Sequence, residues 1–162
     1  SGLYFRGKLA YARCFARPAD PADPVAADGV LVMTPNAGLR AADTPVTIAS
    51  LRAFAEVEID AGNPAYRRPL ERSAQALRDA IGDECEVVLL GSIASGKYVD
   101  LLLPIFGTRL MFPPVFVGRG DMSRGGLMLR SVTAGVELEY APIAGAARRG
   151  RRPPRLEPRR TR

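Results

Sequence analysis

The 162-residue chain contains no histidine and only two cysteines. Without histidine, Ser-His-Asp and Cys-His nucleophilic sites in their usual form are excluded, and so is His-ligated zinc. Acid–base chemistry would have to use Asp, Glu, Lys, Tyr or a bound cofactor. Cys14 and Cys85 lie in apolar contexts without CxxC spacing, which predicts buried free thiols. We therefore expect no metal and no resident cofactor, in a reducing cytoplasm.

Long apolar runs are also missing. No run approaches the roughly 20 residues that span a bilayer, and the N-terminus shows no secretory pattern. The hydrophobic content of 47% is that of an ordinary globular protein. We expect a soluble protein without a membrane partner. Residue 1 is Ser rather than Met, so a preceding strand would be invisible in this sequence.

The positive charge is concentrated at the C-terminus. The formal net charge is +6, yet residues 148–162 hold eight arginines and a single acid, so the rest is nearly neutral. We predict a single domain over residues 1–144 and a basic Arg/Pro-rich tail over residues 145–162 that cannot fold alone. Its candidate contacts to RNA or DNA phosphates are Arg148, Arg149, Arg151, Arg152 and Arg155. The alternatives are a disordered solubility feature and an anchor in a protein assembly.

Apolar patterning predicts alternating helices and strands. Continuous apolar runs indicate strands buried on both faces, and residues at helical spacing indicate helices. The expected helices are residues 3–16, 45–58, 69–81, 98–106 and 123–134; the expected strands are residues 29–34, 86–90, 109–117 and 136–140. This order predicts an α/β fold: a three-layer Rossmann-like domain with a mainly parallel sheet of about four strands.

Small or polar loops follow three of the predicted strands, at residues 34–38, 91–97 and 118–126. If the strands are parallel, these loops meet at one edge of the sheet, where such folds bind ligands. The expected ligand-binding residues are Asn36, Gly91, Ser92, Ser95, Lys97, Arg119, Ser123 and Arg124.

The loop at residues 91–97 fits the pattern G-x-x-x-x-G-K between a predicted strand and a predicted helix. Tyr98 stands where a phosphate loop has the Ser or Thr that holds magnesium. The pattern therefore favours a looser anion site, with backbone N–H groups at the helix start and Lys97 as donors. The alternative is a glycine turn with a solvated lysine.

The segment at residues 117–126 combines four glycines with two arginines, an aspartate and a serine. Glycines beside a core strand are typical of places where the backbone approaches something closely. Asp121 is the candidate catalytic residue, and the alternative is that it caps the following helix. Arg119 and Arg124 are either a bidentate phosphate clamp or solvated loop charges.

Residues 3–12, the turn at residues 36–39, and residues 97–126 resemble uncharacterised bacterial α/β proteins of unknown function. Residues 29–40, 87–94 and 116–126 are similar in order to the strand-end motifs of the uracil-DNA-glycosylase-like fold. That resemblance implies a base or nucleotide bound at the strand ends. The family has a histidine near the third motif, and this chain has none. The resemblance therefore implies the fold without the glycosylase chemistry.

These features together predict a nucleotide- or nucleic-acid-associated domain that binds a phosphate-bearing ligand at the strand ends. As an enzyme it would be a hydrolase acting on a nucleoside or nucleotide. The alternative is a non-enzymatic subunit of a larger protein or ribonucleoprotein assembly, anchored by the tail. Whether the chain is an enzyme stays open at this point.

Overall fold

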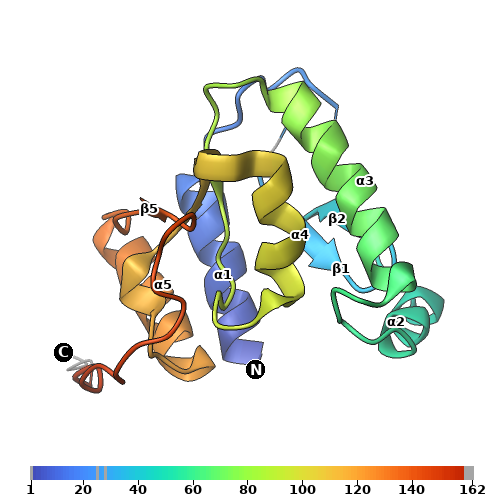
Figure 1. The fold of residues 1–162 in the computed structure, drawn as a ribbon. Coiled ribbons are helices and arrows are strands. Elements are labelled where there is room, and N and C mark those ends of the chain that lie inside the picture. Colours follow the sequence, from blue (N-terminus) through green and yellow to red (C-terminus); the bar gives the residue numbers. More distant parts are fainter. Residues whose placement is uncertain (1, 25, 28, 159–162) are drawn as a thin grey trace.

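The computed structural model describes residues 2–24, 26–27 and 29–158, and helices dominate it (Figure 1). Helices, with the 3-10 turns included, make up 46% of the described residues, and strands make up 10%. The helices are α1 (Gly2–Phe15), α2 (Ile48–Ala55), α3 (Pro64–Ile81), α4 (Gly96–Phe106) and α5 (Asp121–Ala134), with 3-10 turns η1 (Gly107–Arg109) and η2 (Pro114–Phe116). The strands are β1 (Leu31–Thr34), β2 (Gly38–Ala41), β3 (Val87–Val88), β4 (Leu110–Phe112) and β5 (Ala141–Pro142).

The strands form two small sheets. In the described part of the chain β1 pairs with β2 antiparallel, while β4 pairs with β3 parallel and with β5 antiparallel. The prediction of a three-layer Rossmann-like domain with a mainly parallel sheet of about four strands was therefore wrong. One cause is that β4 ends at Phe112. The next two residues, Pro113 and Pro114, lack the backbone N–H group that strand pairing needs.

The apolar run at residues 29–34 contains β1, which forms a hairpin with β2. The Thr34 hydroxyl donates to the carbonyl of Gly38 at 2.8 Å and accepts from the Ala37 N–H at 3.0 Å. Gly38 has φ +66° and lies against Pro69 and Ser73 of α3, so a side chain there would be strained and would collide with that helix. The loop at residues 34–38 is thus a hairpin turn packed on α3.

Helices α1 and α5 cross at a contact between glycines. A Cβ on Gly7 would lie 2.9 Å from the carbonyl oxygen of Gly125, and a Cβ on Gly125 would lie 3.1 Å from the Cα of Tyr4. The two backbones therefore approach more closely than any side chain would allow. Figure 1 shows the two helices side by side.

Two hydrophobic clusters of described residues form the core. The larger one joins α3 and α4 to the strands, around Leu70, Val99 and Leu110. The smaller one joins α1 to α5 around Tyr11, Phe116 and Met128. Leu89 packs in the first cluster and Leu90 in the second, so the segment that continues β3 lies between the two.

Other local predictions were shifted or wrong. The helix expected over residues 45–58 is capped by Thr47, whose side chain accepts from the Ser50 N–H. The helix expected from residue 69 begins at Pro64, because Asn63 caps it. Residues 136–140 form no strand, since the Tyr11 hydroxyl accepts the Leu138 N–H at 2.8 Å in place of a neighbouring strand. Over the described ranges, no helix has the length and apolar character needed to cross a membrane.

Candidate functional site

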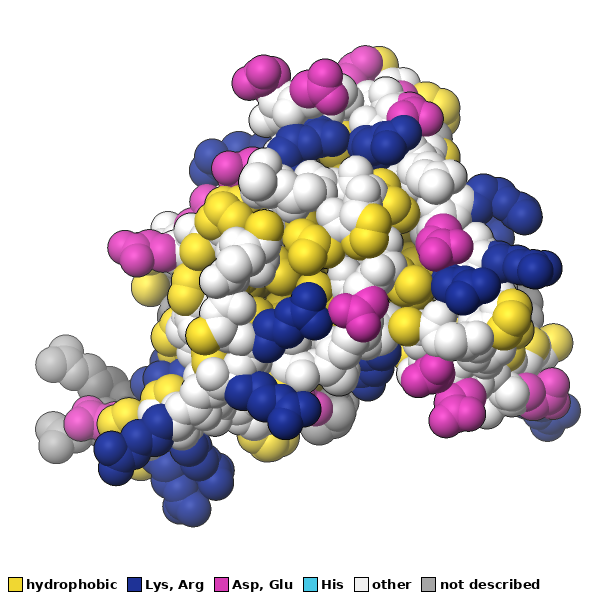
Figure 2. Space-filling model, viewed as in Figure 1, with side chains coloured by type: hydrophobic (Ala, Val, Ile, Leu, Met, Phe, Trp, Pro, Cys, Tyr) yellow, Lys and Arg dark blue, Asp and Glu magenta, His cyan; other side chains and the backbone are white. Residues whose placement is uncertain are grey.

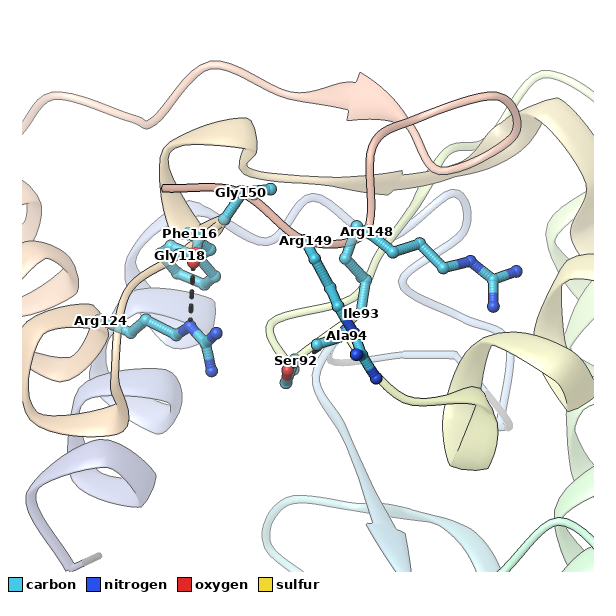
Figure 3. A pocket seen from close by; sticks show the side chains of 11 residues that line it. Ser92, Ile93, Ala94, Phe116, Gly118, Arg124, Arg148, Arg149 and Gly150 are labelled. Carbon is cyan, nitrogen blue, oxygen red and sulfur yellow. Dashed lines mark hydrogen bonds between the residues drawn. The ribbon is translucent and has the colours of Figure 1, made fainter. Parts of the chain in front are cut away.

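A cavity of about 260 Å³ brings three separate segments together (Figure 3). Residues 91–94 reach it from the end of β3, residues 116–118 from η2, and residues 148–150 from the start of the tail. Arg124, in the first turn of α5, completes the lining. We call this set the arginine pocket, because Arg124, Arg148 and Arg149 are its charged members and the described lining contains no acid.

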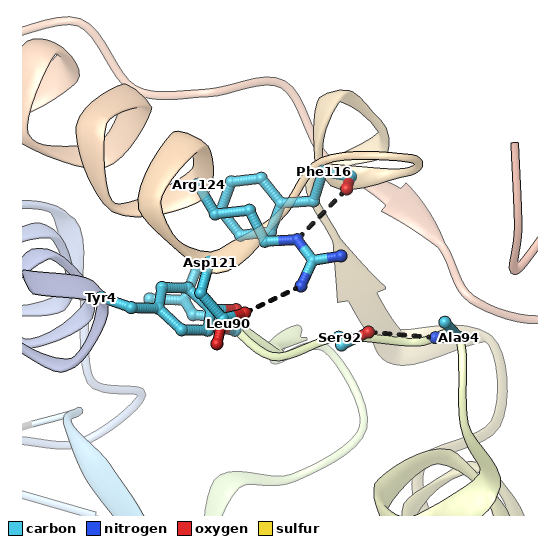
Figure 4. Close-up of polar contacts among 7 residues, drawn as sticks. All are labelled: Tyr4, Leu90, Ser92, Ala94, Phe116, Asp121 and Arg124. Atoms are coloured by element: carbon cyan, nitrogen blue, oxygen red, sulfur yellow. Dashed lines mark hydrogen bonds and ion pairs between the residues drawn. The ribbon is translucent and has the colours of Figure 1, made fainter. Parts of the chain in front are cut away.

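Arg124 is the most constrained residue of the pocket. It is 8% exposed, and its Nε donates to the carbonyl of Phe116 at 3.2 Å. Its Nη1 lies 3.4 Å from Oδ1 of Asp121, three residues earlier in α5 (Figure 4). A guanidinium has five N–H donors in a rigid fork, so these contacts orient the group and leave capacity for an anion.

Tyr4 of α1 lies beside Arg124, and the sequence did not mark it as a site residue. Its hydroxyl donates to the carbonyl of Leu90 at 3.1 Å, which ties α1 to the loop that enters the pocket. Burial raises the pKa of Tyr4, and the positive charge of Arg124 offsets part of that rise. Tyr4 therefore stays a neutral hydrogen-bonding group around neutral pH.

The two tail arginines of the pocket differ in their partners. Arg148 Nη1 lies 3.2 Å from Oδ1 of Asp100 on α4, and in Figure 3 its guanidinium points away from the cavity. Arg149 extends alongside Ile93 and Ala94 toward the loop (Figure 3). Among the residues that the structure describes, no acid forms an ion pair with Arg149. Its charge is the one that a bound anion would neutralise.

The loop at residues 91–97 divides between two surfaces. Gly91 and Ser92 line the arginine pocket, and the Ser92 hydroxyl accepts the Ala94 N–H at 3.3 Å. Ser95 is the N-cap residue of α4, without a side-chain cap bond, and is exposed. The Lys97 Nζ lies over the ring of Tyr98, 5.1 Å from its centroid, and does not line this pocket. The predicted anion site at Lys97 and the start of α4 therefore differs from the pocket that forms.

Arg119 and Ser123 hold the tail rather than the pocket. Arg119 donates to the Val115 carbonyl at 3.0 Å, to the Ser123 hydroxyl at 3.1 Å and to the Pro154 carbonyl at 3.3 Å. Gly118 has φ +74°, and a Cβ there would lie 2.3 Å from the carbonyl oxygen of Arg151. Glycine is needed at this position because another backbone segment comes close to it. That segment is the chain's own tail.

Further contacts fix the tail along α5. The Arg130 guanidinium donates to the carbonyl of Glu157, and Leu156 lies against Gly126. The tail predicted to lack structure of its own therefore packs on the domain as far as its description extends, and it brings Arg148 and Arg149 to the pocket. Arg151, Arg152 and Arg155 remain exposed. Figure 2 shows basic side chains gathered around the tail at the lower left.

Two predicted site residues lie elsewhere. Asn36 belongs to the β1–β2 hairpin turn and lines no part of the arginine pocket. Asp121 is exposed and is the first residue of α5. It does not cap the helix, because Gly120 is the N-cap residue, and it pairs with Arg124 instead. Its catalytic role stays a prediction.

The prediction for the two cysteines is confirmed in part. Both are free, and Cys14 is exposed, so its predicted burial was wrong. Within the described ranges, no group of three or more Cys, Asp or Glu side chains is placed to hold a metal ion.

The site consists of residues that are distant in sequence, and its charged members are three arginines. Comparisons of the chain with models of known protein families, with curated proteins and with solved structures found no match. What this chain can bind is therefore inferred from the geometry of the arginine pocket.

Proposed function

We propose that the chain binds a phosphate-bearing ligand, such as a nucleotide, in the arginine pocket. One observation carries this proposal: among the described residues, three arginines and no acid line a cavity of about 260 Å³. Arginine pairs with phosphate through charge-assisted, bidentate hydrogen bonds. The volume is slightly below that of cavities which enclose a whole drug-sized ligand, about 300 Å³ and upward. A phosphate group would enter the pocket, and the rest of the ligand would extend out of it.

The ion pairs around the pocket indicate which arginine dominates. Arg124 and Arg148 already have ion-pair partners, Asp121 and Asp100 respectively. Arg149 adds the remaining positive charge from an exposed side chain. Arg124 would therefore act as a fixed, pre-oriented donor, and Arg149 would close on the anion.

Calorimetric titration of the full chain with AMP and with adenosine tests this proposal. We expect AMP to bind and adenosine to bind at least tenfold more weakly, because only AMP carries the phosphate. Arg149→Ala should weaken AMP binding at least tenfold. Arg155→Ala is the matched control, since Arg155 is an exposed arginine of the same tail outside the pocket, and it should bind AMP like the wild type. Equal binding of AMP and adenosine would refute the proposal.

The exposed arginines of the tail favour single-stranded RNA or DNA as the source of the phosphate. Arg151, Arg152 and Arg155 extend the positive charge beyond the pocket. Replacing all three with Gln keeps the backbone contacts of the tail and removes the charges. The slope of log K against log salt for a homopolymer should then become shallower by about 2, because each phosphate that is no longer neutralised reduces it by about 0.7. An unchanged slope would show that these three arginines neutralise no phosphate.

A further inference from the structure

A second and larger cavity, of about 730 Å³, lies between the two sheets. Every residue of β1 lines it, and so does every residue of the segment 87–90. Successive side chains of a strand point to opposite faces. A cavity lined by consecutive residues of two strands is therefore bounded by the strand edges rather than by one face of a sheet. We call this cavity the strand groove.

Within the described residues, the edges of β1 and β3 that line the groove have no strand partner. β1 pairs there only with β2, and β3 pairs only with β4. The N–H of Leu89 bonds to the carbonyl of Met111 and so continues the pairing with β4. The opposite edge of each strand presents backbone donors and acceptors. The Leu90 carbonyl on that edge already accepts from the Tyr4 hydroxyl at 3.1 Å. Leaving the other groups unpaired in an apolar setting costs free energy.

Apolar side chains line both faces of the groove. Seven charged side chains also belong to its lining: Lys8, Arg17, Glu84, Glu86, Lys97, Asp121 and Glu137. Tyr4, Tyr11 and Phe15 of α1 line one face, with the smaller core cluster. The other face is lined by residues of the larger cluster: Tyr66, Leu77, Leu102 and Phe106 of α3 and α4. These two clusters lie on opposite sides of the segment that continues β3, since Leu89 packs in one and Leu90 in the other.

We infer that the strand groove is a binding site for an extended, apolar β-strand of a partner polypeptide. Such a strand offers hydrogen-bonding groups along both of its edges, which would pair with β1 on one side and β3 on the other. Its alternate side chains would pack on α1 and on the α3–α4 face. Addition of a strand to a free sheet edge is a known mode of peptide recognition. β1 is four residues long, or about 13 Å, so the groove fits a strand of about five residues.

A small apolar molecule would fill the space and leave the remaining backbone groups of both edges unpaired. A second copy of this chain would have to present an apolar strand, and its own apolar strands are already part of the fold. A separate strand would hydrogen-bond to both strand edges and pack on both faces of the groove, so it is the favoured occupant.

The test uses the full chain and a fluorescein-labelled peptide with the core Val-Leu-Val-Leu-Val and two lysines at each end. The matched control peptide carries N-methyl groups on alternate core residues, which remove the N–H groups of one edge and keep every side chain. Fluorescence anisotropy should show saturable binding of the first peptide and at least tenfold weaker binding of the second. Hydrogen exchange of the β1 and β3 amides should slow on binding, while exchange in the middle of α5 stays unchanged.

Several results would overturn the inference. Equal affinity for the two peptides would show an apolar crevice without strand pairing. Absence of binding would show that the groove accepts no strand, and so would slowed exchange confined to other elements. A native mass corresponding to two copies of the chain, with the peptide unable to dissociate them, would assign the groove to self-association.

Discussion

Helix α1 has two sides that differ sharply in packing. Toward α5, the backbones touch through Gly7 and Gly125 with no room for a methyl group. Toward β1 and β3, the same helix borders a cavity of about 730 Å³. The glycine-rich segment that looked most like a ligand site is thus partly a packing contact between helices. The apolar strands that were expected to be buried on both faces border a cavity.

The largest expected effect is a loss of folding stability at alkaline pH, and it arises on the side of α1 that borders the strand groove. Tyr4, Tyr11, Tyr66 and Tyr140 all line the strand groove, and burial raises the pKa of each above its ordinary value of 10.0. The folded state keeps their protons while the unfolded state loses them. Stability is therefore complete below pH 10 and falls above it, by up to about 1.4 kcal/mol per pH unit for each tyrosine.

Ultraviolet absorbance of the phenolates and circular dichroism, followed together from neutral to alkaline pH, check this prediction. The two signals should change in a single cooperative step above pH 10. Tyr66→Phe removes one titrating group, so the decline of its free energy of unfolding with pH should be shallower. The tyrosines could instead ionise near pH 10 while the protein keeps its helices. That result would show that water fills the groove, and it would make the difference between the two sides of α1 larger.

The tight side predicts opposite outcomes for two adjacent glycines. Gly125→Ala places a methyl group against the backbone of Tyr4 and Leu3, and we expect a loss of about 1–3 kcal/mol in the free energy of unfolding. At Gly126 a methyl group would meet only the end of the Leu156 side chain. Because alanine is the better helix former, Gly126→Ala should be neutral or slightly stabilising. Urea unfolding measures both, and equal effects would contradict the proposed close crossing.

A smaller loss of stability is expected where the tail packs beside α5. Arg119→Ala removes the bonds to the carbonyls of Val115 and Pro154 and to the Ser123 hydroxyl. We expect about 1 kcal/mol of local destabilisation, which is roughly a fivefold increase in opening of the tail. Limited trypsin digestion at residues 151–155 should accelerate by that factor. Arg72→Ala, on the exposed face of α3, is the control and should leave the rate unchanged.

Local patterns predicted the helices far better than the sheet. α1, α4 and α5 lie within two residues of their expected limits, because helical spacing, proline and glycine signals are local. Strand pairing is not local. The hairpin partner β2 was missed, since the polar turn at residues 34–38 gave no sign that the chain reverses and pairs with itself. The run at residues 109–117 could not become a full strand, because two prolines interrupt it.

The candidate site was predicted in part. Gly91, Ser92 and Arg124 do meet in one pocket, together with Arg148 and Arg149, which the sequence placed in nucleic-acid contacts alone. Glycine in a sequence indicates that something comes close to the backbone without saying what. At Gly118 and Gly125 the close neighbours are the tail and α1. Tyr4 was missed because its role depends on the crossing of α1 and α5.

Mapping the bound position of AMP by chemical-shift perturbation of backbone amides tests the central claim most directly. The arginine pocket predicts that the largest changes fall at residues 91–94, 117–118 and 149–150, and that Arg149→Ala abolishes them. Changes centred on the strand groove, around Lys97 and the β1 strand, would contradict the assignment of the phosphate site to the pocket.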